Sequence, residues 1–114
     1  PMVDTCLEAA KEASQEGRNL EVIDVRSLSP LDMATVYESV RRTTRAIVVQ
    51  EAPRTQGVGA EIAARLGEEL YYVMEAPVLR VTGWSTPYPP AKAEGEHIPD
   101  VDRILDAVDR SLAF

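Results

Sequence analysis

Cysteine and histidine are nearly absent from this sequence, and their scarcity excludes several kinds of site. Cys6 is the only cysteine among 114 residues, so no internal disulfide can form. It lies in an apolar helical stripe without a cationic residue spaced to activate it, which favours a small buried hydrophobe over a reactive thiol. His97 is also alone, whereas a metal site normally combines several His, Cys, Asp or Glu ligands. The sequence therefore predicts neither a disulfide nor a metal site.

Long apolar runs and an excess of positive charge are also lacking. No run approaches the roughly 18 apolar residues that a membrane-spanning helix requires. The N-terminus lacks the basic stretch, apolar stretch and cleavage site of an export signal, so we expect a cytoplasmic protein. The formal net charge is -7, which argues against nucleic-acid binding, because that depends on clustered Lys and Arg. A basic protein partner suits this charge better.

What the sequence does contain is the balance of an ordinary globular domain. Hydrophobic residues make up 45% of the chain and charged residues 27%. A chain of 114 residues can build one core but not two. We therefore expect residues 1–114 to form a single domain.

Four segments carry apolar residues at helical spacing. The first covers residues 2–16 and ends at Gly17, which suits a left-handed C-terminal cap. The second begins with Ser29 as N-cap and Pro30 as first helical residue, and Asp32 completes a variant capping box. The third and fourth helices carry these apolar stripes: Val58, Ile62, Leu66 and Leu70; then Val101, Ile104, Leu105, Val108 and Leu112.

Three short apolar runs, residues 20–25, 46–49 and 78–82, have the length of strands. The run 46–49 does not alternate with polar residues, which predicts a strand covered on both faces. Helices and strands alternate along the chain, so the right-handed crossover rule predicts an α/β fold, a three-layer α/β/α sandwich around a mainly parallel sheet. Residues 84–92 are rich in proline and aromatics, and Trp84 and Tyr88 are expected to pin an irregular loop.

No motif in the chain indicates catalysis. Gly57 and Gly59 open a helix, but a dinucleotide fingerprint would have a third glycine where Ile62 stands, so we interpret them as packing residues. Glu51 is placed at the end of a strand, where open α/β folds gather ligand groups, but no histidine accompanies it. The serines lack the surroundings of a hydrolase nucleophile.

Three segments together resemble the transketolase C-terminal domain as it occurs in the beta subunits of thiamine-diphosphate-dependent 2-oxo acid dehydrogenases. They are residues 21–32 (EVIDVRSLSPLD), residues 48–63 with VVQEAPRT and GVGAEIA, and residues 76–91 with APVLRVTG and TPYPPA. Their order and spacing cover nearly the whole chain. Gln56 departs from the pattern, since many relatives carry glycine there, which weakens any backbone-to-ligand role for that turn.

The resemblance implies a segment of a longer beta subunit that assembles with an alpha subunit and a second beta subunit. Such an enzyme decarboxylates pyruvate or branched-chain 2-oxo acids and transfers the acyl group to a lipoyl acyltransferase. Thiamine diphosphate and magnesium would be held outside these residues, so we expect no catalytic, cofactor or metal residue here. The implied partner is the basic peripheral subunit-binding domain of the acyltransferase, and the candidate contacts are Glu75 and the carboxylate of Phe114.

The resemblance also implies a strand before residue 2, lying in the sheet between residues 21–25 and residues 46–50. Direct pairing of residues 22–25 with residues 47–49 would contradict it. Two alternatives stay open: the equivalent domain of a transketolase or a deoxyxylulose phosphate synthase, and a non-enzymatic interaction domain. The loop at residues 86–90 and the short last helix favour the dehydrogenase.

Overall fold

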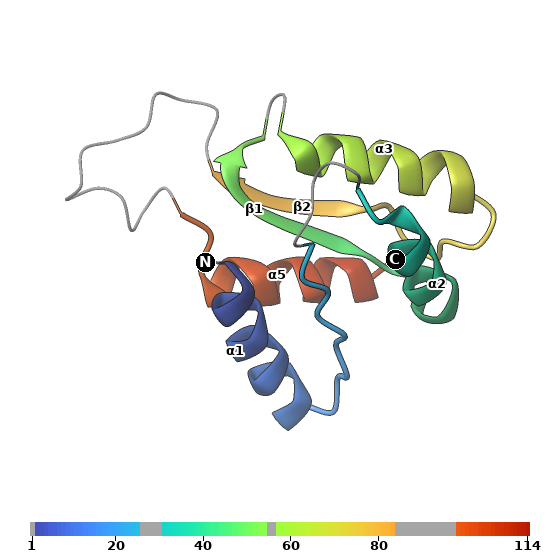
Figure 1. The fold of residues 1–114 in the computed structure, drawn as a ribbon. Helices are drawn as coiled ribbons and strands as arrows, with labels where there is room; N and C mark the ends of the chain where they lie inside the picture. The colour runs from blue at the N-terminus through green and yellow to red at the C-terminus, as the bar shows by residue number, and fades with distance from the viewer. Residues whose placement is uncertain (1, 26–30, 55–56, 84–97) are drawn as a thin grey trace.

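The chain folds into three layers, with a small parallel sheet between two pairs of helices (Figure 1). The computed structural model describes residues 2–25, 31–54, 57–83 and 98–114. Its elements are α1 (Met2–Gln15), α2 (Met33–Thr43), β1 (Ile47–Pro53), α3 (Val58–Leu70), β2 (Leu79–Gly83) and α5 (Val101–Leu112). Within these residues no helix is both long and apolar enough to cross a membrane. The predicted α/β/α architecture is confirmed.

The described sheet consists of β1 and β2, which pair in parallel with Ile47 opposite Leu79 and Val49 opposite Val81. The register shifts between Val49 and Pro53, where the ladder is irregular. Side chains alternate across the sheet, so Val48 packs against one helical layer while Ile47 and Val49 pack against the other. The prediction that this strand is covered on both faces is therefore confirmed.

The helices α2 and α3 cover one face of the sheet. Their apolar stripes meet in one buried cluster: Met33, Val36, Val40, Ile62, Leu66 and Leu70. Three of the four residues predicted for the α3 stripe are in it, whereas Val58 is 41% exposed at the first turn. Burial of this cluster removes two amphipathic helix faces from water, which is the main force that holds the layer on the sheet.

The helices α1 and α5 cover the other face. Ala9 of α1 and Ile104 and Ala107 of α5 pack with Val81 of β2, and the half-buried Cys6 lies against the same cluster. Burial raises the pKa of the Cys6 thiol, in agreement with its interpretation as a small hydrophobe. Leu112 departs from its predicted stripe and is 46% exposed. It stands at the border of the buried face, since Ser111 continues the line of Ile104 and Val108.

One of the two predicted helix ends is confirmed. Gly17 has a φ of 82°, and the Arg18 N–H donates to the Ala13 carbonyl at 2.9 Å, which closes α1 with a left-handed cap. Asp100 caps α5 by accepting from the Arg103 N–H at 2.9 Å.

The predicted start of the second helix is wrong. The helix begins at Met33 with Asp32 as N-cap, because the Asp32 carboxylate accepts from the Thr35 N–H at 3.2 Å. Asp32 can make this bond itself, so the helix does not need a cap three residues earlier. Ser29 and Pro30 lie outside the described residues.

The predicted strand over residues 20–25 is also wrong, because these residues form neither strand nor helix. A strand needs a neighbour that supplies backbone donors and acceptors, and among the described residues the sheet consists of β1 and β2 alone, neither of which pairs with this run. Ile23 nevertheless packs against the α2–α3 cluster, so its apolar character is used.

Direct pairing of residues 22–25 with residues 47–49 would have contradicted an intervening strand, and these residues do not pair. The intervening strand stays a prediction. The predicted loop with Trp84 and Tyr88 lies outside the described residues, as do Gln56 and His97.

Candidate functional site

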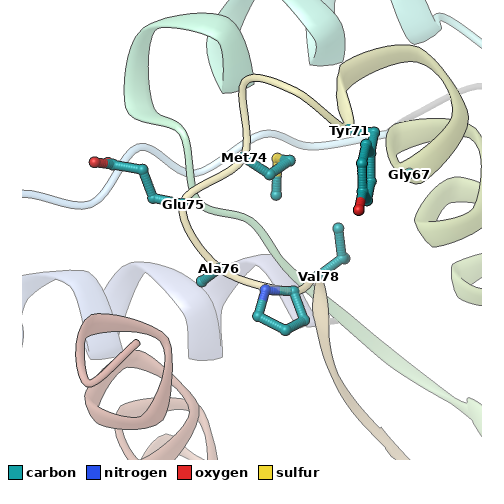
Figure 2. Close-up of a pocket in the computed structure, with 7 residues that line it drawn as sticks. Gly67, Tyr71, Met74, Glu75, Ala76 and Val78 are labelled. Atoms are coloured by element: carbon teal, nitrogen blue, oxygen red, sulfur yellow. The ribbon is translucent and has the colours of Figure 1, made fainter.

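Glu75 lies at the edge of the sheet where the parallel strands begin. Its backbone N–H donates to the Thr44 carbonyl at 2.9 Å, and its Oε2 accepts a hydrogen bond from the Thr44 hydroxyl. The residue is exposed, so Thr44 holds both the Glu75 backbone and its carboxylate while the carboxylate still faces water. Figure 2 shows the Glu75 side chain pointing away from the neighbouring groove.

Phe114, the last residue of the sequence, lies at the same edge of the sheet. Helix α5 runs so that its last turn lies beside the start of β1, and there Arg45 Nη1 donates to the Ser111 carbonyl at 2.7 Å (Figure 1). Phe114 follows three residues later and is 66% exposed. Thr44 therefore holds Glu75, and its neighbour Arg45 holds the helix turn that precedes Phe114. We call this region the N-terminal sheet edge, formed by Thr44, Arg45, Glu75 and residues 111–114.

An apolar groove of about 390 Å³ adjoins Glu75. It is lined by Gly67, Tyr71, Met74, Glu75, Ala76, Pro77 and Val78. Figure 2 shows Tyr71, Met74 and Val78 around its centre. These residues come from the end of α3 and from the segment that leads into β2, so the groove continues the N-terminal sheet edge.

Tyr71 lines this groove and Tyr72 follows it in the chain, and the sequence patterns predicted a role for neither. Tyr71 is 70% exposed and Tyr72 97% exposed, with their rings in an edge-to-face contact at 5.1 Å between centroids. Exposed aromatic side chains at a groove are typical of protein interfaces. The available signal was their position, directly after Leu70, the last buried residue of the α3 stripe.

Gly59 and Glu51, the two weaker candidates from the sequence, lie toward the other end of the sheet, where β1 ends. Gly59 N–H donates to Gln50 Oε1 at 2.6 Å, and a Cβ at Gly59 would lie 3.0 Å from Val48 Cγ1. The close approach of α3 to β1 therefore requires glycine, as the packing interpretation predicted. Glu51 does not end its strand, because β1 continues to Pro53. In the described residues no group of three or more His, Cys, Asp or Glu is placed to hold a metal ion.

Comparisons with known proteins give one family match and several relatives of one kind. Residues 1–104 match the family described as "Transketolase, C-terminal domain". The chain is 57% identical over 113 residues to the pyruvate dehydrogenase E1 component subunit beta of Leifsonia xyli subsp. xyli, a match that covers 99% of this chain and 34% of that protein.

Two further relatives extend the comparison. The chain is 51% identical to the 3-methyl-2-oxobutanoate dehydrogenase subunit beta of Mycobacterium tuberculosis, over 97% of this chain and 32% of that protein. It is 42% identical to the pyruvate dehydrogenase E1 component subunit beta of Staphylococcus epidermidis, over 99% of this chain and 35% of that protein. The chain thus spans about a third of the length of the relatives it matches.

Proposed function

The chain belongs to the transketolase C-terminal domain family, and we propose that it is the assembly and partner-docking domain of a decarboxylating 2-oxo acid dehydrogenase component. In this proposal residues 1–114 form one domain of a longer beta subunit. The observation that carries the docking role is the N-terminal sheet edge, where the Glu75 carboxylate is held by Thr44 beside an apolar groove and Phe114 is exposed. Relatives over nearly the whole chain are beta subunits of such dehydrogenases, which supports the parent enzyme.

The proposed partners are the alpha subunit, a second beta subunit and the basic peripheral subunit-binding domain of the dihydrolipoyl acyltransferase. Glu75 and the carboxylate of Phe114 would attract basic residues of that domain, and the exposed Phe114 ring would bury apolar surface against it. A net charge of -7 favours such a partner, because opposite charges steer association and suppress wrong partners. The exposed Tyr71 and Tyr72 would add aromatic contact area within the assembly.

Thiamine diphosphate and magnesium would serve the parent enzyme from outside this chain. The magnesium ion that carries the diphosphate takes oxygen ligands, carboxylates among them, and in the described residues no three His, Cys, Asp or Glu side chains are placed to hold a metal ion. The groove beside Glu75 is lined mainly by apolar side chains, which do not suit a diphosphate. The chain's own residues therefore bind and orient partners in this proposal, and the cofactor would supply the decarboxylation chemistry elsewhere in a cytoplasmic enzyme.

Reconstitution tests the proposal. The full-length beta subunit, expressed with its alpha subunit, should transfer an acyl group from pyruvate or a branched-chain 2-oxo acid to a lipoylated acyltransferase. Titration calorimetry should detect thiamine diphosphate binding in that assembly, but not in residues 1–114 alone, because a pocket built from other segments cannot form without them. A micromolar dissociation constant for residues 1–114 alone, or an inactive assembly, would contradict the proposal.

A further inference from the structure

Thr44 adopts a backbone conformation that its side chain disfavours. Its φ of 63° and ψ of 6° place it in the left-handed region, where it ends α2 with its N–H donated to the Val40 carbonyl at 2.7 Å. Glycine or asparagine normally occupies this position, because a branched Cβ crowds the backbone there. Among the described residues Thr44 is the one non-glycine residue with a positive φ. A strained residue of this kind indicates a role beyond the turn itself.

The hydroxyl is what threonine adds at this position. Glycine would keep both main-chain hydrogen bonds, from the Thr44 N–H to Val40 and from the Glu75 N–H to the Thr44 carbonyl. Only the hydrogen bonds of the Thr44 hydroxyl would disappear, and the one that reaches another element is the bond to Glu75 Oε2. The same hydroxyl lies 2.6 Å from the Thr43 carbonyl oxygen, but it has one proton, and an ionised carboxylate is the stronger acceptor.

We propose that Thr44 is a positioning residue that fixes the Glu75 carboxylate for a basic partner. This inference rests on the proposed docking function. A free glutamate side chain loses rotamer freedom when it pairs across an interface, and a side chain already held in place loses less. The Thr44 hydroxyl supplies this preorganisation while the carboxylate stays exposed. Removal of the hydroxyl should therefore weaken docking roughly three- to tenfold, the range expected for one immobilised side chain.

The test uses the assembled alpha and beta subunits and the recombinant peripheral subunit-binding domain of the acyltransferase as probe. Calorimetry would compare the wild type with Thr44→Gly, Thr44→Ser, Glu75→Gln and the double variant Thr44→Gly/Glu75→Gln, alongside their unfolding temperatures. Thr44→Gly should keep or raise the unfolding temperature, because it relieves strain, and yet weaken docking. Thr44→Ser should retain wild-type affinity. The double variant should bind no more weakly than Glu75→Gln, because Thr44 acts through Glu75.

The outcomes separate this inference from the proposed function. If Glu75→Gln weakens docking and Thr44→Gly does not, the inference is wrong and the docking role stands. If Thr44→Gly and Thr44→Ser weaken docking equally, Thr44 has a structural role and the inference is also wrong. If Glu75→Gln leaves the affinity unchanged, both the inference and the role of Glu75 in docking fail.

Discussion

Gly59 and Gly67 both lie in α3, but their surroundings are opposite. A Cβ at Gly59 would stand 2.5 Å from Gln50 Oε1 and 3.0 Å from Val48 Cγ1, whereas a Cβ at Gly67 would have nothing within 4 Å. Alanine is normally the better helix residue by about 1 kcal/mol. The two glycines therefore make a matched pair: packing alone decides whether alanine raises or lowers the free energy of unfolding.

Gly59→Ala should lower the free energy of unfolding by about 1–3 kcal/mol, because overpacking displaces Gln50 and breaks its bond to the helix. Gly67→Ala should raise it by about 1 kcal/mol, because the added methyl meets no atom. Urea unfolding of both variants measures the difference. Equal stabilisation by both substitutions would show that α3 does not approach β1 as closely as described.

Asp32 makes the stability of α2 depend on pH. Hydrogen bonds from the Thr35 hydroxyl, at 2.8 Å, and the Thr35 N–H favour the ionised carboxylate and lower the pKa of Asp32 below 3.8. A lowered pKa in the folded state adds stability that is fully present above 3.8 and is lost as the pH falls through the lowered value. This contribution should be absent when asparagine, which also caps helices, replaces Asp32.

Wild type should therefore lose more stability than Asp32→Asn between about pH 7 and about pH 2, since only the wild type must protonate this carboxyl. Urea unfolding at the two pH values gives the comparison, and a carbon NMR titration reports the pKa of Asp32 directly. A pKa of Asp32 at or above its ordinary value would contradict the described cap.

At the scale of elements, the sequence predicted what depends on local pattern. All four helices lie where apolar spacing placed them, because each buries one face against the sheet. The strands β1 and β2 were also located, although β1 is longer than predicted. The structure of residues 20–25 was predicted wrongly, because apolar content alone does not decide whether a segment pairs with another strand. Strand pairing depends on residues remote in sequence.

Hydrogen exchange tests the strand that the family resemblance implies beside β1. In residues 1–114 alone, the amides of residues 22–25 should exchange quickly, because no ladder holds them. In the full-length beta subunit they should become protected, at a level similar to residues 47–49. If the two proteins show the same exchange at residues 22–25, no additional strand pairs with this segment.

Arg45 joins two elements by holding the last turn of α5 against the start of β1. Its partly buried bond to the Ser111 carbonyl, at 2.7 Å, satisfies a helix-end acceptor. Arg45→Met keeps the aliphatic stem and removes the donor, so it should lower the free energy of unfolding by about 1–2 kcal/mol.

The matched control is Arg42→Met, because Arg42 makes an exposed ion pair with Glu21 at 3.5 Å. Such pairs contribute about 0–1 kcal/mol. Chemical unfolding of both variants would show whether the two arginines differ. If they destabilise the chain equally, Arg45 does not anchor α5.

At the scale of the whole molecule, the resemblance named Glu75 and Phe114 but could not place them together. The contacts that do so join residues 31 positions apart, from Thr44 to Glu75, and 66 positions apart, from Arg45 to Ser111. No local pattern encodes such contacts. The tyrosines and the groove were missed for the same reason, because a groove exists only after α3 and the segment before β2 have packed. The family match confirms the resemblance that the three sequence segments suggested.

The most direct measurement of the docking role is the salt dependence of association between the assembled subunits and the acyltransferase's peripheral subunit-binding domain. Wild type would be compared with Glu75→Gln and with Asp102→Asn, which removes the same charge from the first turn of α5, at the opposite end of that helix from Ser111. Glu75→Gln should slow association at low salt and flatten its salt dependence, because charges across an interface steer encounter. Asp102→Asn should change neither. Identical salt dependence for wild type and Glu75→Gln would contradict docking at the N-terminal sheet edge.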